Sequence, residues 1–296
     1  MSLDDKLIEE LKIQSERDLK EAENILNNHG YIEHVAWYCE QSYEKLVKSI
    51  YAHFKLKIQH GNVKSVYEKI YEKQHYESYK LIINMFREIQ AAFRQSLDNA
   101  TAKIKTKSPE MPEFTINAMS SFIGSANIPS VNRKLENKIS EIDSKIAREI
   151  SSVHAFKDFL SNSTELSLMK SIHSSDIDDL TKKALNQLSK DLKFKSDDPL
   201  FTMVLKSAFS SNEKYLKFYG FISQALVLAR WILPHTSMSR YPILDYDFEN
   251  LKPYRQRETE LKAFFTVLID EIRKLYPTSK DFIDILQYYK DQDLIS

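Results

Sequence analysis

The sequence predicts an all-α protein, because it supplies long amphipathic segments and few residues that turn the chain. Only 4 glycines and 8 prolines occur among 296 residues, whereas glycine alone usually makes up about 7% of a protein. Apolar residues recur at steps of three and four, which is the spacing of one helix face. Strand patterns are nearly absent. Because 42% of the residues are hydrophobic, we expect a helical protein with a sizeable core.

The first two helices are predicted to form an antiparallel hairpin. The apolar stripe of the first helix stops close to Gly30, and glycine is a typical residue at the C-terminal end of a helix. A second stripe covers residues 31–56 and stops before the turn residues Gly61 and Asn62.

The middle of the chain is predicted to be helical with one interruption. Residues 63–104 contain neither proline nor glycine and should form one long helix, or two helices with a bend. Residues 105–132 contain several prolines and serines, so we expect a flexible loop at about this place. Helices should resume at residues 133–160 and 177–192.

The last third of the chain is also predicted to be helical. The expected helices are residues 199–209, 213–233, 256–275 and 280–291. Pro234 should stop the second of these, and Pro277 should separate the last two, since proline removes a helical hydrogen bond. An irregular aromatic connection is expected between Pro234 and Pro253.

Charge and cysteine content argue against several classes of protein. The chain has 42 basic residues (Lys and Arg) and 42 acidic residues (Asp and Glu), so its formal net charge is zero. No overall electrostatic field therefore draws it to nucleic acid or to an anionic membrane. The single cysteine, Cys39, cannot form an intramolecular disulfide, which is typical of a cytoplasmic protein. The first residues lack a signal-peptide pattern, and the most apolar run is too short to cross a bilayer. No membrane contact is expected.

Metal and cofactor motifs are missing from the sequence. The histidines show no metal-ligand spacing, and the His-Glu-x-x-His pattern of zinc enzymes does not occur. With so few glycines the chain has neither a P-loop nor a Gly-x-Gly-x-x-Gly element. We therefore expect no metal and no cofactor.

Three separated segments carry a family resemblance. Residues 18–31 end a helix at a short Gly-Tyr turn, residues 41–48 read Q-S-Y-E-K-L-V-K, and residues 239–242 read S-R-Y-P ahead of a helix. In their order and helical context these segments resemble the HEPN domain family. The resemblance implies an antiparallel HEPN-like helix bundle with an inserted helical subdomain. The bundle would comprise residues 1–61 and 199–296, and the insertion residues 62–198.

The resemblance also implies a function. HEPN proteins include toxins and nucleotide-associated modules, so we expect a nucleotide- or RNA-binding homodimer, in a toxin or defence setting with a nucleotidyltransferase-type partner protein. The alternative is a non-enzymatic protein-interaction scaffold whose insertion contacts a partner.

One arginine and one histidine are candidate catalytic residues. Metal-independent ribonucleases of the HEPN family carry this pair with four to six residues between, and Arg230 and His235 have four between them. A histidine can move a proton near neutral pH, while a guanidinium stabilises charge on a phosphate. Residues five apart on a helix point about 140° away from each other, so the two converge only if Pro234 ends the helix. Alternatively, Arg230 pairs with a carboxylate or caps the helix.

Four further residues are candidate nucleotide- or phosphate-binding groups by resemblance. They are Arg240 and Tyr241 of the S-R-Y-P turn, and Lys45 and Lys48 of the second helix. The ordinary alternative for the turn is that its proline fixes the backbone while the tyrosine packs on the bundle. For Lys48 it is an ion pair with Glu44, one helical turn earlier, on a solvated face.

Overall fold

The computed structural model describes residues 2–28, 30–72, 77–107, 129–151, 199–235, 252–291 and 295, and every regular element in these ranges is helical. The predicted all-α class is confirmed. The predicted loop at 105–132 and the predicted helix at 177–192 fall largely or wholly outside these ranges. No helix in the described parts of the chain is long and apolar enough to cross a membrane.

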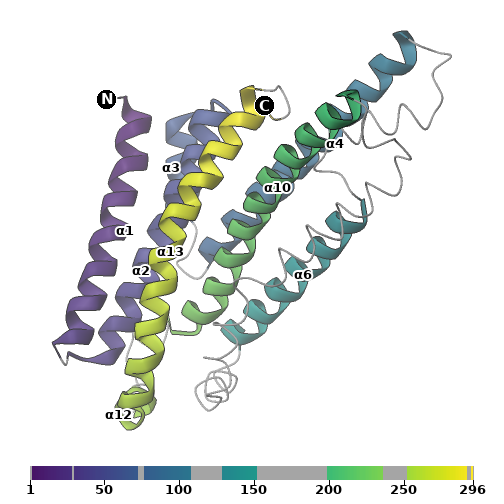
Figure 1. Cartoon of the computed structure of the whole chain (residues 1–296). Helices are drawn as coiled ribbons and strands as arrows, with labels where there is room; N and C mark the ends of the chain where they lie inside the picture. The colour runs from purple at the N-terminus through teal and green to yellow at the C-terminus, as the bar shows by residue number, and fades with distance from the viewer. Residues whose placement is uncertain are drawn as a thin grey trace.

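Helices α1 (Leu3–Asn27) and α2 (Ile32–His53) form the predicted antiparallel hairpin (Figure 1). Helix α1 starts with a capping box, in which Ser2 and Asp5 each accept a hydrogen bond from the other's backbone N–H. After α1 the Gly30 N–H donates to the carbonyl oxygen of Ile25 at 2.8 Å. A Cβ at Gly30 would lie 3.1 Å from that oxygen, so this tight turn favours glycine.

Helix α2 is the centre of the bundle and packs against α1, α4 (Ser78–Lys107), α10 (Pro199–Ile232) and α13 (Glu258–Asp291). Helix α13 lies beside both α1 and α2, so elements from the two ends of the chain share one apolar core (Figure 1). Helix α6 (Pro129–Ser151) packs on α10, on the side away from α1. Cys39 is buried on α2, and this burial raises its pKa, as expected for a packed small hydrophobe.

Aromatic rings join the sequence-distant helices of this core. The ring of Phe282 on α13 stacks on Phe218 of α10, with centroids 5.1 Å apart, and also contacts Phe221 at 4.4 Å. Phe86 of α4 lies 5.8 Å from Phe218. Pairs at these distances add stabilisation beyond the area that they bury.

The second helix ends differently from the prediction. It continues past His53 as one π-helical turn, Phe54–Ile58, before the chain turns into α3 (Val63–Glu72). His60 takes a left-handed backbone conformation, with φ of 53°, and the next N–H, of Gly61, donates to the carbonyl oxygen of Lys55 at 2.8 Å. The uninterrupted stretch that follows forms two helices, α3 and α4, which was one of the two predicted alternatives.

Replacement of Gly61 by alanine should destabilise the protein by about 1–3 kcal/mol, the range for overpacking. A Cβ at this position would lie 2.9 Å from the backbone carbonyl oxygen of Lys55, which cannot move without breaking the π-helical turn. Urea unfolding followed by circular dichroism measures the loss. Ser65→Ala is the control, because Ser65 is exposed and uses only its backbone N–H to bond Asn62. Equal midpoints for the two variants would contradict the prediction.

Two predicted helix breaks are wrong. Residues 199–209 and 213–233 belong to the single helix α10, because serine and asparagine between them are weak helix formers rather than breakers. Helix α13 runs through Pro277, where a break was expected. Apolar residues on both sides of the proline, such as Leu275 and Phe282, enter the same core, and their burial offsets a proline cost of about 3 kcal/mol.

Hydroxyl groups after Pro277 bond back to the preceding turn. The Ser279 hydroxyl donates to the carbonyl oxygen of Tyr276 at 2.6 Å, and the Thr278 hydroxyl donates to the carbonyl oxygen of Leu275 at 3.0 Å. Such back-bonding is common for serine and threonine inside a helix. Core packing on both sides of Pro277 therefore explains the continuous helix.

Candidate functional site

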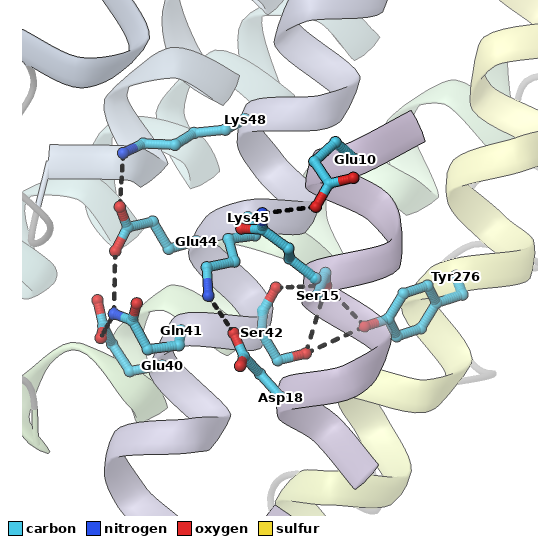
Figure 2. Close-up of polar contacts among 11 residues, drawn as sticks. Glu10, Ser15, Asp18, Glu40, Gln41, Ser42, Glu44, Lys45, Lys48 and Tyr276 are labelled. Atoms are coloured by element: carbon cyan, nitrogen blue, oxygen red, sulfur yellow. Dashed lines mark hydrogen bonds and ion pairs between the residues drawn. The ribbon is translucent and has the colours of Figure 1, made fainter. Parts of the chain in front are cut away.

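Lys45 and Lys48, two of the predicted phosphate-binding residues, lie on α2 in different environments (Figure 2). Lys45 is half-buried and forms an ion pair with Asp18 of α1. Lys48 donates to Glu44 Oε1 at 2.5 Å, and the two side chains are only 6% and 4% exposed. The predicted Glu44–Lys48 pair is thus present, but it is buried rather than on a solvated face.

The buried ion pair belongs to a longer polar row. Gln41 Nε2 donates to Glu40 Oε2 at 2.7 Å and lies 3.4 Å from Glu44 Oε2 (Figure 2). On the other side, the Lys48 ammonium lies 5.5 Å from the ring centroid of Tyr71 on α3, a cation–π distance. Lys48 is therefore held by protein groups, and Lys45 is the lysine of this motif nearer to solvent.

Three hydroxyl groups connect the hairpin to α13 beside this row (Figure 2). The Ser15 hydroxyl donates to the carbonyl oxygen of Ser42 at 2.6 Å and lies 2.6 Å from the Tyr276 hydroxyl. The Ser42 hydroxyl is 3.0 Å from the same Tyr276 oxygen. Burial raises the pKa of Tyr276, so its hydroxyl stays protonated and can donate. This cluster fixes α13 against the α1–α2 hairpin.

Arg230 lies in the last turn of α10, where the helix ends as predicted before Pro234. After the end of α10 the Leu233 N–H donates to the Ala229 carbonyl oxygen at 2.9 Å. The Arg230 guanidinium lies 6.0 Å from the Trp231 ring centroid. It also faces Glu141 of α6, whose pKa is lowered mainly by a hydrogen bond from Lys145 and, more weakly, by Arg230.

His235 lies inside the core just after the end of α10, and only 1% of its surface is exposed. Its Nδ1 atom is 2.8 Å from the hydroxyl of Tyr254 on α12 (Lys252–Gln256), and the rings of Phe264 and Phe265 on α13 pack around it. Burial lowers the pKa of His235 to about 3. The imidazole is therefore neutral at physiological pH.

The structure does not bring the predicted catalytic residues onto one surface. The described contacts of Arg230 go to Trp231 and α6, whereas those of His235 go to α12 and α13. Arg240 and Tyr241 lie outside the described residues. The assignment of Arg230 and His235 to catalysis, and of Arg240 and Tyr241 to phosphate binding, stays a prediction.

Sequence reasoning missed two partners of the predicted residues and one further neighbour. Asp18 pairs with Lys45 across the hairpin, and Tyr254 bonds His235. Glu33 of α2 lies near Tyr254, where its charge adds to burial in raising the pKa of that tyrosine. Hydrophobic periodicity predicts the helices but not the register between them, so it could not identify these pairs.

The described part of the chain contains no group of three or more His, Cys, Asp or Glu side chains that could hold a metal ion.

Comparison with known protein families tests the resemblance to the HEPN domain family. The model of the HEPN domain family matches residues 8–125. Over these residues the chain is similar to the HEPN domain family, which confirms the resemblance. The match covers the α1–α2 hairpin, with Lys45 and Lys48, and continues over α3 and α4. No curated protein and no solved structure matches the chain.

The range of the HEPN match bears on the domain division predicted from the sequence. That division put α3 and α4 in an inserted subdomain, residues 62–198, whereas the match includes both helices. Arg230, His235, Arg240 and Tyr241 lie beyond the matched residues. Because α10 and α13 also pack on the HEPN hairpin, the bundle of residues 1–61 and 199–296 stays a proposal.

Proposed function

We propose that this HEPN protein binds nucleotides or RNA. The match of the HEPN domain to residues 8–125 carries the proposal, since HEPN domains are associated with nucleotide and RNA chemistry. Lys45 supports it, because this half-buried cation lies on the HEPN hairpin with only a carboxylate from α1 as its ion-pair partner in the described structure. A phosphate can replace or share that partner. We further propose a homodimer that acts with a nucleotidyltransferase-type protein in a toxin or defence setting.

Fluorescence anisotropy with labelled RNA oligonucleotides and labelled nucleotides tests the binding. The wild type should bind more weakly as salt rises, and Lys45→Ala and Arg240→Ala should each reduce the salt slope by about one if each residue contacts one phosphate. Lys64→Ala is the matched control, because Lys64 is a far more exposed lysine, at 85%, on α3. Absence of binding by the wild type at low salt would contradict the proposed function.

Ribonuclease activity is a narrower proposal with its own experiment. RNA is incubated in EDTA with the wild type, His235→Ala and Tyr254→Phe. The tyrosine variant keeps the ring but removes the hydroxyl that lies 2.8 Å from His235 Nδ1. Metal-independent cleavage that is lost in His235→Ala, in a variant still folded by circular dichroism, would support catalysis. Equal rates in wild type and variant, or no cleavage at all, would remove the enzymatic proposal.

The alternative, a protein-interaction scaffold, is favoured by one observation. Tyr67 and Tyr71 on α3 are exposed, at 48% and 54%, and their ring centroids lie 4.2 Å apart. An aromatic pair on a surface is typical of a protein contact. If the wild type binds no nucleotide, and Tyr67→Ser with Tyr71→Ser converts a dimer to a monomer in sedimentation, the scaffold replaces the binding proposal.

A further inference from the structure

One face of α2 carries aromatic rings that lie mostly outside the core. Tyr31, His34, Tyr38 and Lys45 follow one another at steps of three, four and seven residues, so they lie on the same side of the helix. Tyr31 is 68% exposed, His34 is exposed, and their rings lie 5.8 Å apart. The half-buried Trp37 ring contacts Tyr38 at 4.6 Å. We call Tyr31, His34, Trp37 and Tyr38 the α2 aromatic face.

Other aromatic residues of α2 supply most of its aromatic contacts with the core. Tyr43 and Tyr51 of α2 are fully buried in the core, together with Phe54 after it. By contrast, of the four rings on the aromatic face only Tyr38 packs in part against the core. Exposed rings with no core role mark a surface that contacts something else.

We propose that the α2 aromatic face stacks the bases of single-stranded RNA while Lys45 binds a phosphate. This inference rests on the proposed function and locates its ligand. Stacking on aromatic rings combined with cations along the strand is how proteins bind single-stranded nucleic acid.

The composition and charge of the face favour RNA over a protein helix. Its rings alternate with polar groups, and none of the residues on this stripe is aliphatic, whereas a helix-binding groove needs aliphatic contacts. Glu33, Glu40 and Glu44, the acidic residues of the same part of α2, are buried and so present no carboxylate to a phosphate. Lys45 supplies the cation about 21 Å from Tyr31 along the helix axis, at 1.5 Å per residue.

The N-terminal end of α2 also lies next to the end of α10. Helix α2 begins, α10 ends and α12 lies at the same end of the bundle (Figure 1). Glu33, the neighbour of His34 in sequence, is close enough to Tyr254 to raise its pKa, and Tyr254 contacts His235. An RNA strand on the aromatic face would therefore start at the end of the bundle that contains the predicted catalytic histidine.

Tryptophan fluorescence gives a direct readout of stacking. Trp37 and Trp231 are the two tryptophans of the chain, and Trp231 is only 3% exposed. A single-stranded oligouridylate should therefore quench the emission of Trp37, and Trp37→Phe should abolish that quenching. Inorganic polyphosphate, which has no bases, should leave the emission unchanged in the wild type.

Binding affinity, measured by anisotropy with the same oligonucleotide, tests the face itself. Tyr31→Ala should weaken binding about fivefold or more, the lower limit for one stacked base. Leu3→Ala is the matched control, because Leu3 of α1 is 67% exposed, close to the 68% of Tyr31, and this variant should bind as the wild type does. Asp18→Asn should strengthen binding up to about fivefold, since it removes a carboxylate that competes with phosphate for Lys45.

The outcomes separate this inference from the proposed function. If RNA binds the wild type but neither quenches Trp37 nor binds Tyr31→Ala more weakly, the ligand lies elsewhere and only the inference is overturned. Equal affinity for duplex and single-stranded RNA also overturns it, because paired bases cannot stack on the face. A change of oligomeric state in Tyr31→Ala, with RNA affinity unchanged, assigns the face to a protein contact instead. If the wild type binds no RNA or nucleotide, both proposals fail.

Discussion

Lys48→Met is expected to destabilise the folded protein by about 3–5 kcal/mol, the cost of removing one partner from a buried ion pair. Lys48 and Glu44 are 6% and 4% exposed and their charged atoms lie 2.5 Å apart. Without the ammonium group, the buried Glu44 carboxyl group would lose the attraction that offsets its burial, next to Glu40, which is also buried. Neither water nor a mobile counterion could replace the lost attraction there.

The chain supplies a matched control for this ion pair. Lys64 and Glu68 are also four residues apart on a helix, but they are 85% and 53% exposed. Lys64→Met should therefore change the stability by less than about 0.5 kcal/mol, as is usual for surface positions. Urea unfolding followed at the helical circular dichroism signal compares the two variants.

The double variant Glu44→Gln with Lys48→Met distinguishes charge burial from packing. It removes both charges while keeping side chains of similar size, so it should recover most of the stability lost in Lys48→Met. If the double variant is as unstable as the single one, packing rather than charge accounts for the effect. If Lys48→Met is as stable as Lys64→Met, Lys48 is solvated, and its predicted role in phosphate binding gains support.

Stability should fall by about 4 kcal/mol between pH 6.5 and pH 3 because of His235 alone, at about 1.4 kcal/mol per unit of pKa difference. Burial in the aromatic core lowers the pKa of His235 from 6.5 to about 3. Below pH 6.5 the unfolded chain therefore takes up a proton that the folded chain does not. The stabilisation is complete above pH 6.5, declines as pH falls, and is lost below about pH 3.

A variant with an aromatic ring in place of the imidazole separates the pH dependence caused by His235 from that caused by other titrating groups. His235→Phe combined with Tyr254→Phe replaces a buried hydrogen-bonded pair by two apolar rings, which leaves no buried donor without an acceptor. The unfolding free energies of the wild type and the double variant are measured in urea from pH 7 to pH 4. The wild type should lose stability relative to the double variant as pH falls, because only the wild type has His235 to protonate on unfolding. At pH 5 this difference should have moved by about 2 kcal/mol relative to pH 7.

Parallel pH profiles for the wild type and the double variant would contradict the buried position of His235. They would show that the imidazole titrates equally in the folded and unfolded chains, as a solvated residue does. Such a result would also favour the catalytic proposal, because a general acid or base must reach its substrate.

The secondary structure was predictable where local signals decide it. The turn at Gly30, the end of α10 before Pro234 and the helical periodicity of α1 and α2 all appear as expected. The prediction failed at Pro277, where a local breaker was overridden by core packing on both sides of it. It also missed the π-helical turn after His53, which has no sequence pattern of its own.

The site was predictable only in part. The motif at residues 41–48 pointed to a HEPN domain, and the HEPN match confirms that resemblance. The sequence placed Glu44 and Lys48 on one helix face but did not reveal that the face is covered. Likewise, the short spacing of Arg230 and His235 contains no sign that the histidine turns into the core against Tyr254.

By itself the sequence determined the helical class, the N-terminal hairpin and the resemblance of residues 8–125 to the HEPN family, because periodicity, turn residues and motifs act over a few neighbouring positions. Only the tertiary structure decided which polar residues reach solvent. Lys48 and His235 are enclosed by helices from distant parts of the chain, while Tyr31 and His34 stay outside. Burial depends on how whole helices pack, and no local pattern specifies that packing.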